Sequence, residues 1–219
     1  MNDRDRGFRF GLMLEYIGLG YNVLEAILSI VFGSIAGSVA LVAFGLDSVV
    51  ESLSGMVLIW RLRKHGTLSK VEEERIERTA VFLVGLTFII LGGYVLFEAS
   101  QTLFEWVFHS TPLPGGLTMP GGQEVPDASL PGVLIALASI TIMPTLAYLK
   151  YRTGKRIGSR ALVADSKETM TCAVLSVALL LGLGLNYLFG WWWADPVAGI
   201  LIAGFLFREG MELLSGDED

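Results

Sequence analysis

The stretch "SIAGSVALVAFGLDSVVESLSGMVLIW", residues 34–60, decides the fold. It is long and apolar enough to cross a bilayer, because about 20 such residues span the hydrocarbon core. Asp47 and Glu51 interrupt it near its middle. An ionised side chain at that depth costs about 2.5–3.5 kcal/mol on insertion scales. Two of them therefore require compensation by a bound metal ion, by protonation or by facing polar groups.

The whole chain has the composition of a membrane protein. Of its 219 residues, 53% are hydrophobic and 17% are charged, and the mean hydropathy is +0.58. A soluble domain of this size is less apolar. We therefore expect an all-α membrane protein, a bundle of six transmembrane helices. The apolar stretches cover residues 11–33, 34–60, 79–103, 132–150, 165–189 and 195–213.

The basic residues predict the orientation of the chain. The first apolar stretch follows three arginines, but it is too long for a signal peptide and has no clear cleavage site, so we assign it as a spanning helix. None of the 16 basic residues lies in the segments after the first, third or fifth stretch. Because basic residues collect in cytoplasmic loops, both termini are predicted to be cytoplasmic. Lys150 is counted here with the cytoplasmic segment before residue 165. A prokaryotic cytoplasmic membrane is the expected location.

The segments between the apolar stretches add few candidates. Residues 104–131 are rich in Pro and Gly and predict a flexible outer loop. The chain ends soon after the last stretch, so residues 1–219 are expected to form a single transmembrane domain with no soluble domain. One cysteine excludes a disulfide within the chain. The net charge of −6 indicates no nucleic-acid partner.

Asp47 and Glu51 are the first candidates for a site. Their i, i+4 spacing puts their Cβ atoms about 5–6 Å apart on one helix face. Two negative charges at that distance repel each other, and a divalent cation or a proton between them relieves the repulsion. The alternative is a pair of protonated residues with only a packing role.

A short repeat supplies the second half of the candidate site. The letters "ALVA" occur at residues 40–43 and 161–164, and this alignment places Asp47 over Glu168 and Glu51 over Cys172. The two helices run antiparallel, as in transporters whose inverted repeats enclose a site in the middle of the membrane. Three carboxylates and a thiol give the four ligands of a tetrahedral site, and a thiolate favours softer ions such as Zn²⁺. Cys172 fits a small packing residue equally well.

Other polar residues rank below these four. Asn22 and Glu25 are spaced i, i+3 in the first stretch, where they could border the site, form a second proton or metal station, or simply join helices by hydrogen bonds. Glu15 lies nearer a helix end and is expected in water or at the membrane interface. Asp165 and Lys167 are expected near the cytoplasmic mouth, where Lys167 can extend towards water.

At these residues the sequence resembles the cation diffusion facilitator family. "SVALVAFGLDSVVES" is similar to that family's second helix, "ADSKETMTC" to its fifth and "WWWADPVAGILIAGFLFREGMELL" to its sixth. The resemblance implies a homodimeric six-helix exporter that exchanges Zn²⁺ or a similar ion for protons, with the metal held by Asp47, Glu51, Glu168 and Cys172. Two ligands depart from the family pattern, because Glu168 replaces a His or Asp and Cys172 replaces an Asp. We expect the family's cytoplasmic metal-binding domain to be missing here, as in its short relatives.

Three functions follow from these observations. The leading one is export of a divalent transition-metal cation in exchange for protons, with Zn²⁺ favoured and Cd²⁺, Co²⁺, Fe²⁺ or Mn²⁺ possible. The second is a metal-binding sensor or partner subunit that does not transport. The third is an antiporter of organic cations and protons. The sequence has no nucleotide motif and no nucleophile–base pair, so we expect no enzyme and no cofactor, the metal being the transported substrate.

Overall fold

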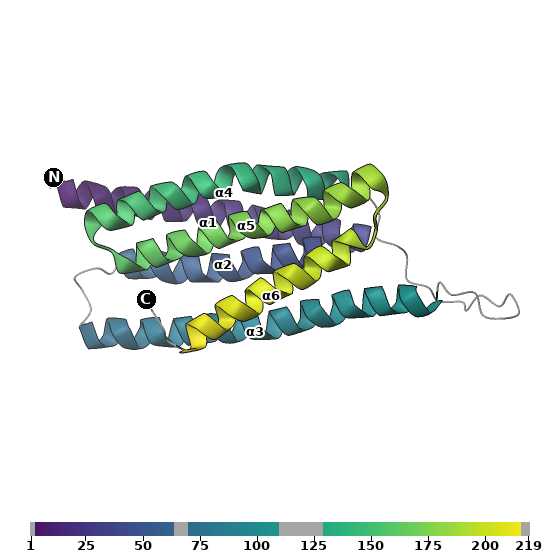
Figure 1. Ribbon diagram of the computed structural model, residues 1–219. Coiled ribbons are helices and arrows are strands. Elements are labelled where there is room, and N and C mark those ends of the chain that lie inside the picture. Colours follow the sequence, from purple (N-terminus) through teal and green to yellow (C-terminus); the bar gives the residue numbers. More distant parts are fainter. Residues whose placement is uncertain (1–2, 64–69, 110–128, 216–219) are drawn as a thin grey trace, which may run out of the picture.

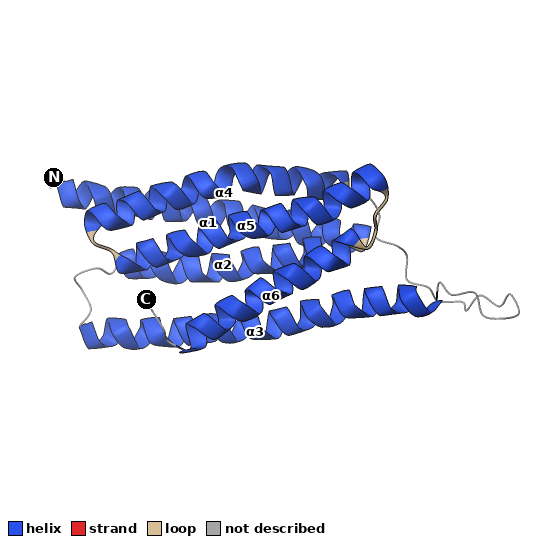
Figure 2. Cartoon of the chain, viewed as in Figure 1, coloured by secondary structure: helices blue, strands red, loops and turns tan. Residues whose placement is uncertain are grey.

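The computed structural model describes residues 3–63, 70–109 and 129–215, and almost all of them are helical (Figure 2). The element order confirms the predicted all-α bundle. The helices are α1 (Asp3–Ala36), α2 (Val39–Arg63), α3 (Lys70–His109), α4 (Leu130–Ile157), α5 (Arg160–Phe189) and α6 (Ala194–Ser215).

These helices extend beyond the apolar stretches, because a helix can continue into water after its apolar part ends. α1 begins before residue 11, and α4 continues to Ile157 rather than ending at residue 150. The segment predicted as an outer loop is still helical up to His109 and is helical again from Leu130. Its remaining residues, 110–128, lie outside the described part of the chain.

Five helices are long and apolar enough to cross a membrane. The candidate spans are Arg6–Ala36, Val39–Trp60, Gly85–Phe104, Leu130–Ile157 and Ala161–Phe189. α6 is absent from this set because Asp195 lies at its start and Arg208, Glu209 and Glu212 lie in its second half. The protein is therefore a multi-pass integral membrane protein with five candidate spans.

The helices form a four-helix bundle and a separate pair. α1 packs along α2, α4 packs along α5, and these two hairpins contact each other. α3 and α6 form the third tight pair, in which α6 also contacts α2 and α5 (Figure 1). Figure 1 shows α6 crossing obliquely between the bundle and α3. α2 and α5 thus both face α6.

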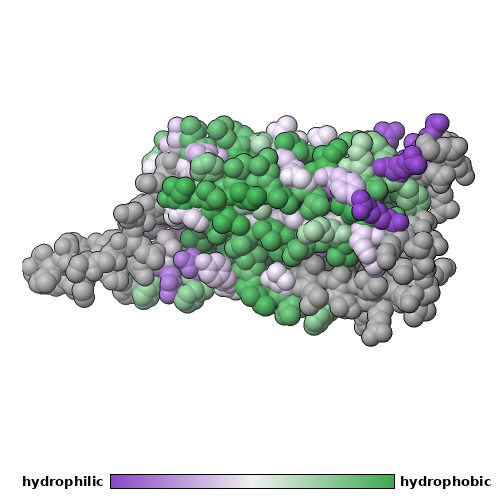
Figure 3. Space-filling view, turned by 180° about the vertical axis from the view of Figure 1, so that it is seen from behind, coloured by the Kyte–Doolittle hydropathy of each residue, from purple (hydrophilic) through white to green (hydrophobic). Residues whose placement is uncertain are grey.

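The outer surface suits a lipid environment. Seen from behind, hydrophobic residues cover the middle of the molecule, and strongly hydrophilic ones gather mainly at one end (Figure 3). Large apolar side chains such as Ile35, Ile90 and Leu188 are well exposed. Exposure of so much apolar surface to water is unfavourable in free energy, whereas its exposure to hydrocarbon is not.

The two hairpins repeat each other in detail. α1 ends at Gly37 and α4 ends at Gly158, and both glycines have a positive φ, of 63° and 73°. Each is followed by a serine that caps the next helix: Ser38 Oγ accepts from the backbone N–H of Leu41 at 3.0 Å, and Ser159 Oγ from that of Leu162 at 3.3 Å.

The repeat is inverted with respect to the bundle axis. Successive helices alternate in direction, so the turn at Gly37 and the turn at Gly158 lie at opposite ends (Figure 1). The same contacts recur beside both turns: a Cβ placed on Gly33 would meet Val42, and one on Gly154 would meet Val163. Equivalent residues therefore approach the middle of the membrane from opposite sides.

Candidate metal site

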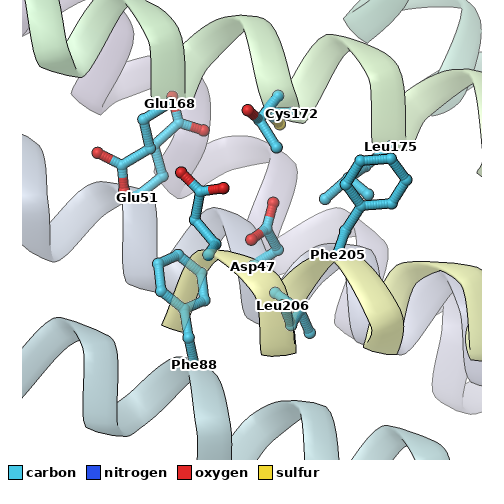
Figure 4. A pocket seen from close by; sticks show the side chains of 10 residues that line it. Asp47, Glu51, Phe88, Glu168, Cys172, Leu175, Phe205 and Leu206 are labelled. Atoms are coloured by element: carbon cyan, nitrogen blue, oxygen red, sulfur yellow. The ribbon is translucent and has the colours of Figure 1, made fainter. Parts of the chain in front are cut away.

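A pocket lies between α2, α5, α6 and α3, near the middle of the α2 and α5 helices (Figure 4). Asp47 and Glu51 reach it from α2, and Glu168 and Cys172 reach it from α5. Its apolar wall consists of Phe88, Leu175, Phe205 and Leu206, and Thr171 and Glu209 complete the lining. The cavity volume of about 10 Å³ is near the size that admits one water molecule.

The structure thus brings all four predicted ligands to one pocket. Among the described residues, however, no three His, Cys, Asp or Glu side chains come close enough together to hold one ion. The reason is that three of the four are drawn towards separate neighbours. Glu51 is held by Thr169, Glu168 by Ser54, and the thiol of Cys172 lies beside Glu25. Binding of one ion by all four therefore requires these side chains to move towards each other.

Each of the two glutamates has one bonded and one unbonded oxygen. Thr169 Oγ donates to Oε1 of Glu51 at 3.0 Å, and Ser54 Oγ donates to Oε2 of Glu168 at 3.0 Å. The other oxygen of each carboxylate, Oε2 of Glu51 and Oε1 of Glu168, is buried without a hydrogen-bond partner. A buried acceptor without a partner is costly, so these oxygens are ready to receive a cation.

Cys172 and Asp47 occupy the other side of the pocket. The Cys172 side chain is 2% exposed, and its Sγ lies 4.0 Å from Oε2 of Glu25. Asp47 is also buried and lies one helical turn from Glu51. The residues on this side offer one soft donor and one hard donor.

Asn22 and Glu25 lie on α1, behind the pocket rather than in its lining. Ser48 Oγ donates to Oε2 of Glu25 at 2.9 Å, whereas Oε1 of Glu25 and Oδ1 of Asn22 are buried without partners. Glu25 therefore adjoins the candidate site through Cys172. From this position Glu25 can border the metal site or bind a second proton or metal ion. It also joins α1 to α2 through its hydrogen bond with Ser48.

Two sequence-based assignments are wrong. Lys150 is not a cytoplasmic loop residue, and Glu15 is not in water or at the interface, because the two side chains are 2% and 1% exposed. Lys150 Nζ lies 2.6 Å from Oδ2 of Asp165 and 3.4 Å from Oε1 of Glu15. Both assignments failed because charge alone was taken to mark a helix end. The spacing of Lys150 from the buried residues Met143 and Ala147 would have placed it on the inner face of α4.

The sequence did not single out Glu209, which lies on α6 and lines the pocket. Neither histidine contributes to this lining in the described part of the chain. His65 lies outside the described residues, and His109 is the last residue of α3.

Buried charge in the described residues is strongly unbalanced. Six carboxylates are buried, and Lys150 is the one buried cation among these residues. The six carboxylates belong to Glu15, Glu25, Asp47, Glu51, Asp165 and Asp195. Because unpaired buried charge is very costly, this interior favours the uptake of further cations, either metal ions or protons.

Fold and pocket together define a multi-pass membrane protein with an acidic cavity between its helices. Residues 16–216 match the cation efflux transmembrane domain. The chain therefore belongs to the cation efflux family, whose members are transporters of divalent metal cations.

Individual relatives are distant. An uncharacterized transporter of Synechocystis is 28% identical over 83% of this chain and 54% of its own length. The cation-efflux pump FieF of Shewanella oneidensis is 31% identical over 45% of this chain and 33% of its own. A cadmium, cobalt and zinc/H(+)-K(+) antiporter of Bacillus subtilis is 23% identical over 91% and 58%. The chain spans less than two thirds of the length of each of these three relatives, and 65% of the length of an archaeal transporter.

Proposed function

We propose that the chain is a secondary transporter that exports a divalent transition-metal cation, Zn²⁺ in the first place, in exchange for protons. The cation is bound by Asp47, Glu51, Glu168 and Cys172. The observation that carries this proposal is the pair of buried carboxylate oxygens, one on Glu51 and one on Glu168, that have no hydrogen-bond partner beside the pocket.

The size and chemistry of the pocket support a small metal ion. A cavity of about 10 Å³ admits a body the size of one water molecule, which a bare ion matches and an organic cation exceeds. Carboxylates alone would suit hard ions, but Cys172 adds a soft donor. Zn²⁺ accepts this mixed set in a four-coordinate geometry, and Cd²⁺ and Co²⁺ resemble it in this respect. Fe²⁺ and Mn²⁺ are weaker candidates.

Competition for the same atoms supplies the coupling. A carboxylate or thiolate that binds a proton cannot bind the metal at the same time, so protonation releases the metal and metal binding releases protons. Inverted repeats of this kind support alternating access to a site in the middle of the membrane, and the inverted hairpins fit this mechanism. The proposal also includes the topology: both termini are cytoplasmic, and α6 crosses the membrane like the other five helices. Residues 1–219 form a single domain, and the transporter is a homodimer.

Flux into proteoliposomes tests the proposal. Purified protein is reconstituted, and uptake of Zn²⁺ is followed with a trapped fluorescent indicator, with and without a pH gradient. We expect uptake to rise when the lumen is acidic, since protons then leave as Zn²⁺ enters. Binding without flux would identify a sensor instead, and competition by lipophilic cations against Zn²⁺ would favour an organic-cation transporter. Glu98→Gln is the matched control, because Glu98 is only partly buried and lies outside the pocket.

A further inference from the structure

Thr169 on α5 connects the candidate metal site to a buried ion cluster. Its Oγ donates to Oε1 of Glu51 at 3.0 Å and accepts from Nζ of Lys150 at 3.3 Å. Lys150 is in turn held by Asp165 at 2.6 Å and by Glu15 at 3.4 Å. Thr169, which is itself fully buried, thus joins Glu51 of α2 to Lys150 of α4, and Lys150 extends the cluster to Glu15 of α1.

The direction in which the Thr169 hydroxyl donates determines which oxygen of Glu51 is left without a hydrogen bond. The hydroxyl has one hydrogen and two acceptors within reach: Oε1 of Glu51, and the backbone carbonyl of Asp165 at 3.1 Å. Lys150 has no acceptor to offer and can only donate, so it occupies a lone pair of the threonine oxygen. With Oε1 of Glu51 bonded in this way, the other oxygen, Oε2, remains as the unbonded acceptor.

A similar hydrogen bond is made by Ser48 on α2. Ser48 on α2 is the residue equivalent to Thr169 when "ALVA" at 40–43 is aligned with 161–164. Its hydroxyl donates to Oε2 of Glu25 at 2.9 Å and lies 3.1 Å from the carbonyl of Phe44. The remaining oxygen of Glu25 also has no partner. Ser48 thus resembles Thr169 in its bonds, although its acceptor lies on α1 and is not the repeat equivalent of Glu51, which is Cys172.

We infer that Thr169 is a positioning residue for the transported metal, which fixes Glu51 so that Oε2 alone is presented to the ion, and that Lys150 acts through Thr169. This inference rests on the proposed function. Hydrogen-bond partners behind a ligand orient it, and loss of one such partner costs about 10–100-fold in metal affinity.

The first experiment measures Co²⁺ binding by visible absorbance to the purified full chain, with the Zn²⁺ affinity obtained by competition. Thr169→Val keeps the shape and removes the hydroxyl, and we expect it to weaken binding about 10–100-fold. Thr169→Ser restores the hydroxyl and should restore binding. Thr141→Val is the control, since Thr141 is an exposed threonine whose hydroxyl bonds only its own helix, at Leu137. Equal affinities for Thr169→Val and the unmodified chain would overturn the inference.

The second experiment tests whether Lys150 acts through Thr169. Lys150→Met is combined with Asp165→Asn and Glu15→Gln, so that neither carboxylate paired with Lys150 is left as an unpaired buried charge. We expect this triple variant to weaken Co²⁺ binding, and to have no further effect in a chain that already carries Thr169→Val. If the two losses in Co²⁺ affinity add in full, Lys150 acts independently of Thr169, and the inference that it acts through Thr169 is overturned.

The outcomes separate this inference from the proposed function. If Glu51→Gln leaves Co²⁺ binding and Zn²⁺ flux unchanged, the proposed site itself is wrong. If Glu51→Gln weakens binding but Thr169→Val does not, the site stands and the positioning role of Thr169 is wrong.

Discussion

Asp195, in the first turn of α6, accepts a hydrogen bond from the hydroxyl of Ser38, the residue that caps α2. The same carboxylate accepts from the backbone N–H of Val39 at 3.0 Å. The start of α2 is thereby attached to α6. Since α2 carries Asp47 and Glu51, this contact fixes one end of the helix that supplies half of the candidate site.

This relationship predicts a difference between two equivalent serines. Ser38→Ala should destabilise the protein more than Ser159→Ala, because Ser38 also bonds Asp195, whereas both serines cap a helix. Loss of a cap costs about 1 kcal/mol, and each kcal/mol shifts the melting temperature by about 2–4 °C for a chain of this size. Thermal unfolding of the two variants in detergent measures the difference. Equal shifts would show that the bond to Asp195 adds nothing.

The orientation can be tested with single cysteines. Lys155 at the end of α4 and Trp193 in the turn before α6 are both exposed, and they lie at opposite ends of the bundle. A membrane-impermeant maleimide applied to intact cells should label Trp193→Cys but not Lys155→Cys. The unmodified chain is the control, because its one cysteine, Cys172, is buried. Labelling of Lys155→Cys alone would reverse the predicted orientation.

The affinity for metal should depend on pH. Protons compete with the metal for the carboxylates and the thiol, so Zn²⁺ affinity should fall as the pH is lowered from about 7.5 to about 5.5. Addition of Zn²⁺ to protein in weak buffer should also release protons. Isothermal titration at several pH values, in buffers of different ionisation enthalpy, measures both effects. An affinity that is constant over this range would argue against exchange through these groups.

The sequence predicted the helices and the ligands for different physical reasons. Six apolar stretches require a solvent other than water, and a pair of acids inside such a stretch, as at Asp47 and Glu51, requires a partner. Both facts are local, so the sequence alone reveals them. The alignment of "ALVA" at 40–43 with 161–164 then pointed to Glu168 and Cys172, and the structure places all four residues on one pocket.

The residues behind the ligands could not be found in this way. Thr169 and Ser54 are small polar residues of a kind that occurs throughout the chain, and only the packing of α5 against α2 gives them their acceptors. Lys150 and Glu15 were assigned by their charge to the membrane surface, although they form a buried ion pair between α4 and α1. Burial of a charged residue becomes visible only when its partner from another helix is known.

Cys172 should set the preference among metals. One thiolate favours Zn²⁺, Cd²⁺ or Co²⁺ over Mn²⁺, whereas a site of carboxylates alone shifts towards harder ions. Cys172→Asp should therefore keep transport but lose the preference for Cd²⁺ over Mn²⁺, and Cys172→Ala should weaken the binding of soft ions most. Bound Zn²⁺ should also protect Cys172 from alkylation, since the thiolate is the reactive form. Unchanged transport by Cys172→Ala, with alkylation equally fast at saturating Zn²⁺, would reduce the cysteine to a packing residue.

The most direct test of the account is Zn²⁺ flux by Asp47→Asn and Glu51→Gln. Each substitution keeps the shape of the side chain and removes its charge, so the protein should still fold and insert, as a size-exclusion profile and a protease digest would verify. The account predicts that both variants lose Zn²⁺ flux in proteoliposomes with an imposed pH gradient, whereas Glu98→Gln transports like the unmodified chain. Normal flux by either Asp47→Asn or Glu51→Gln would contradict the claim that these carboxylates hold the transported cation.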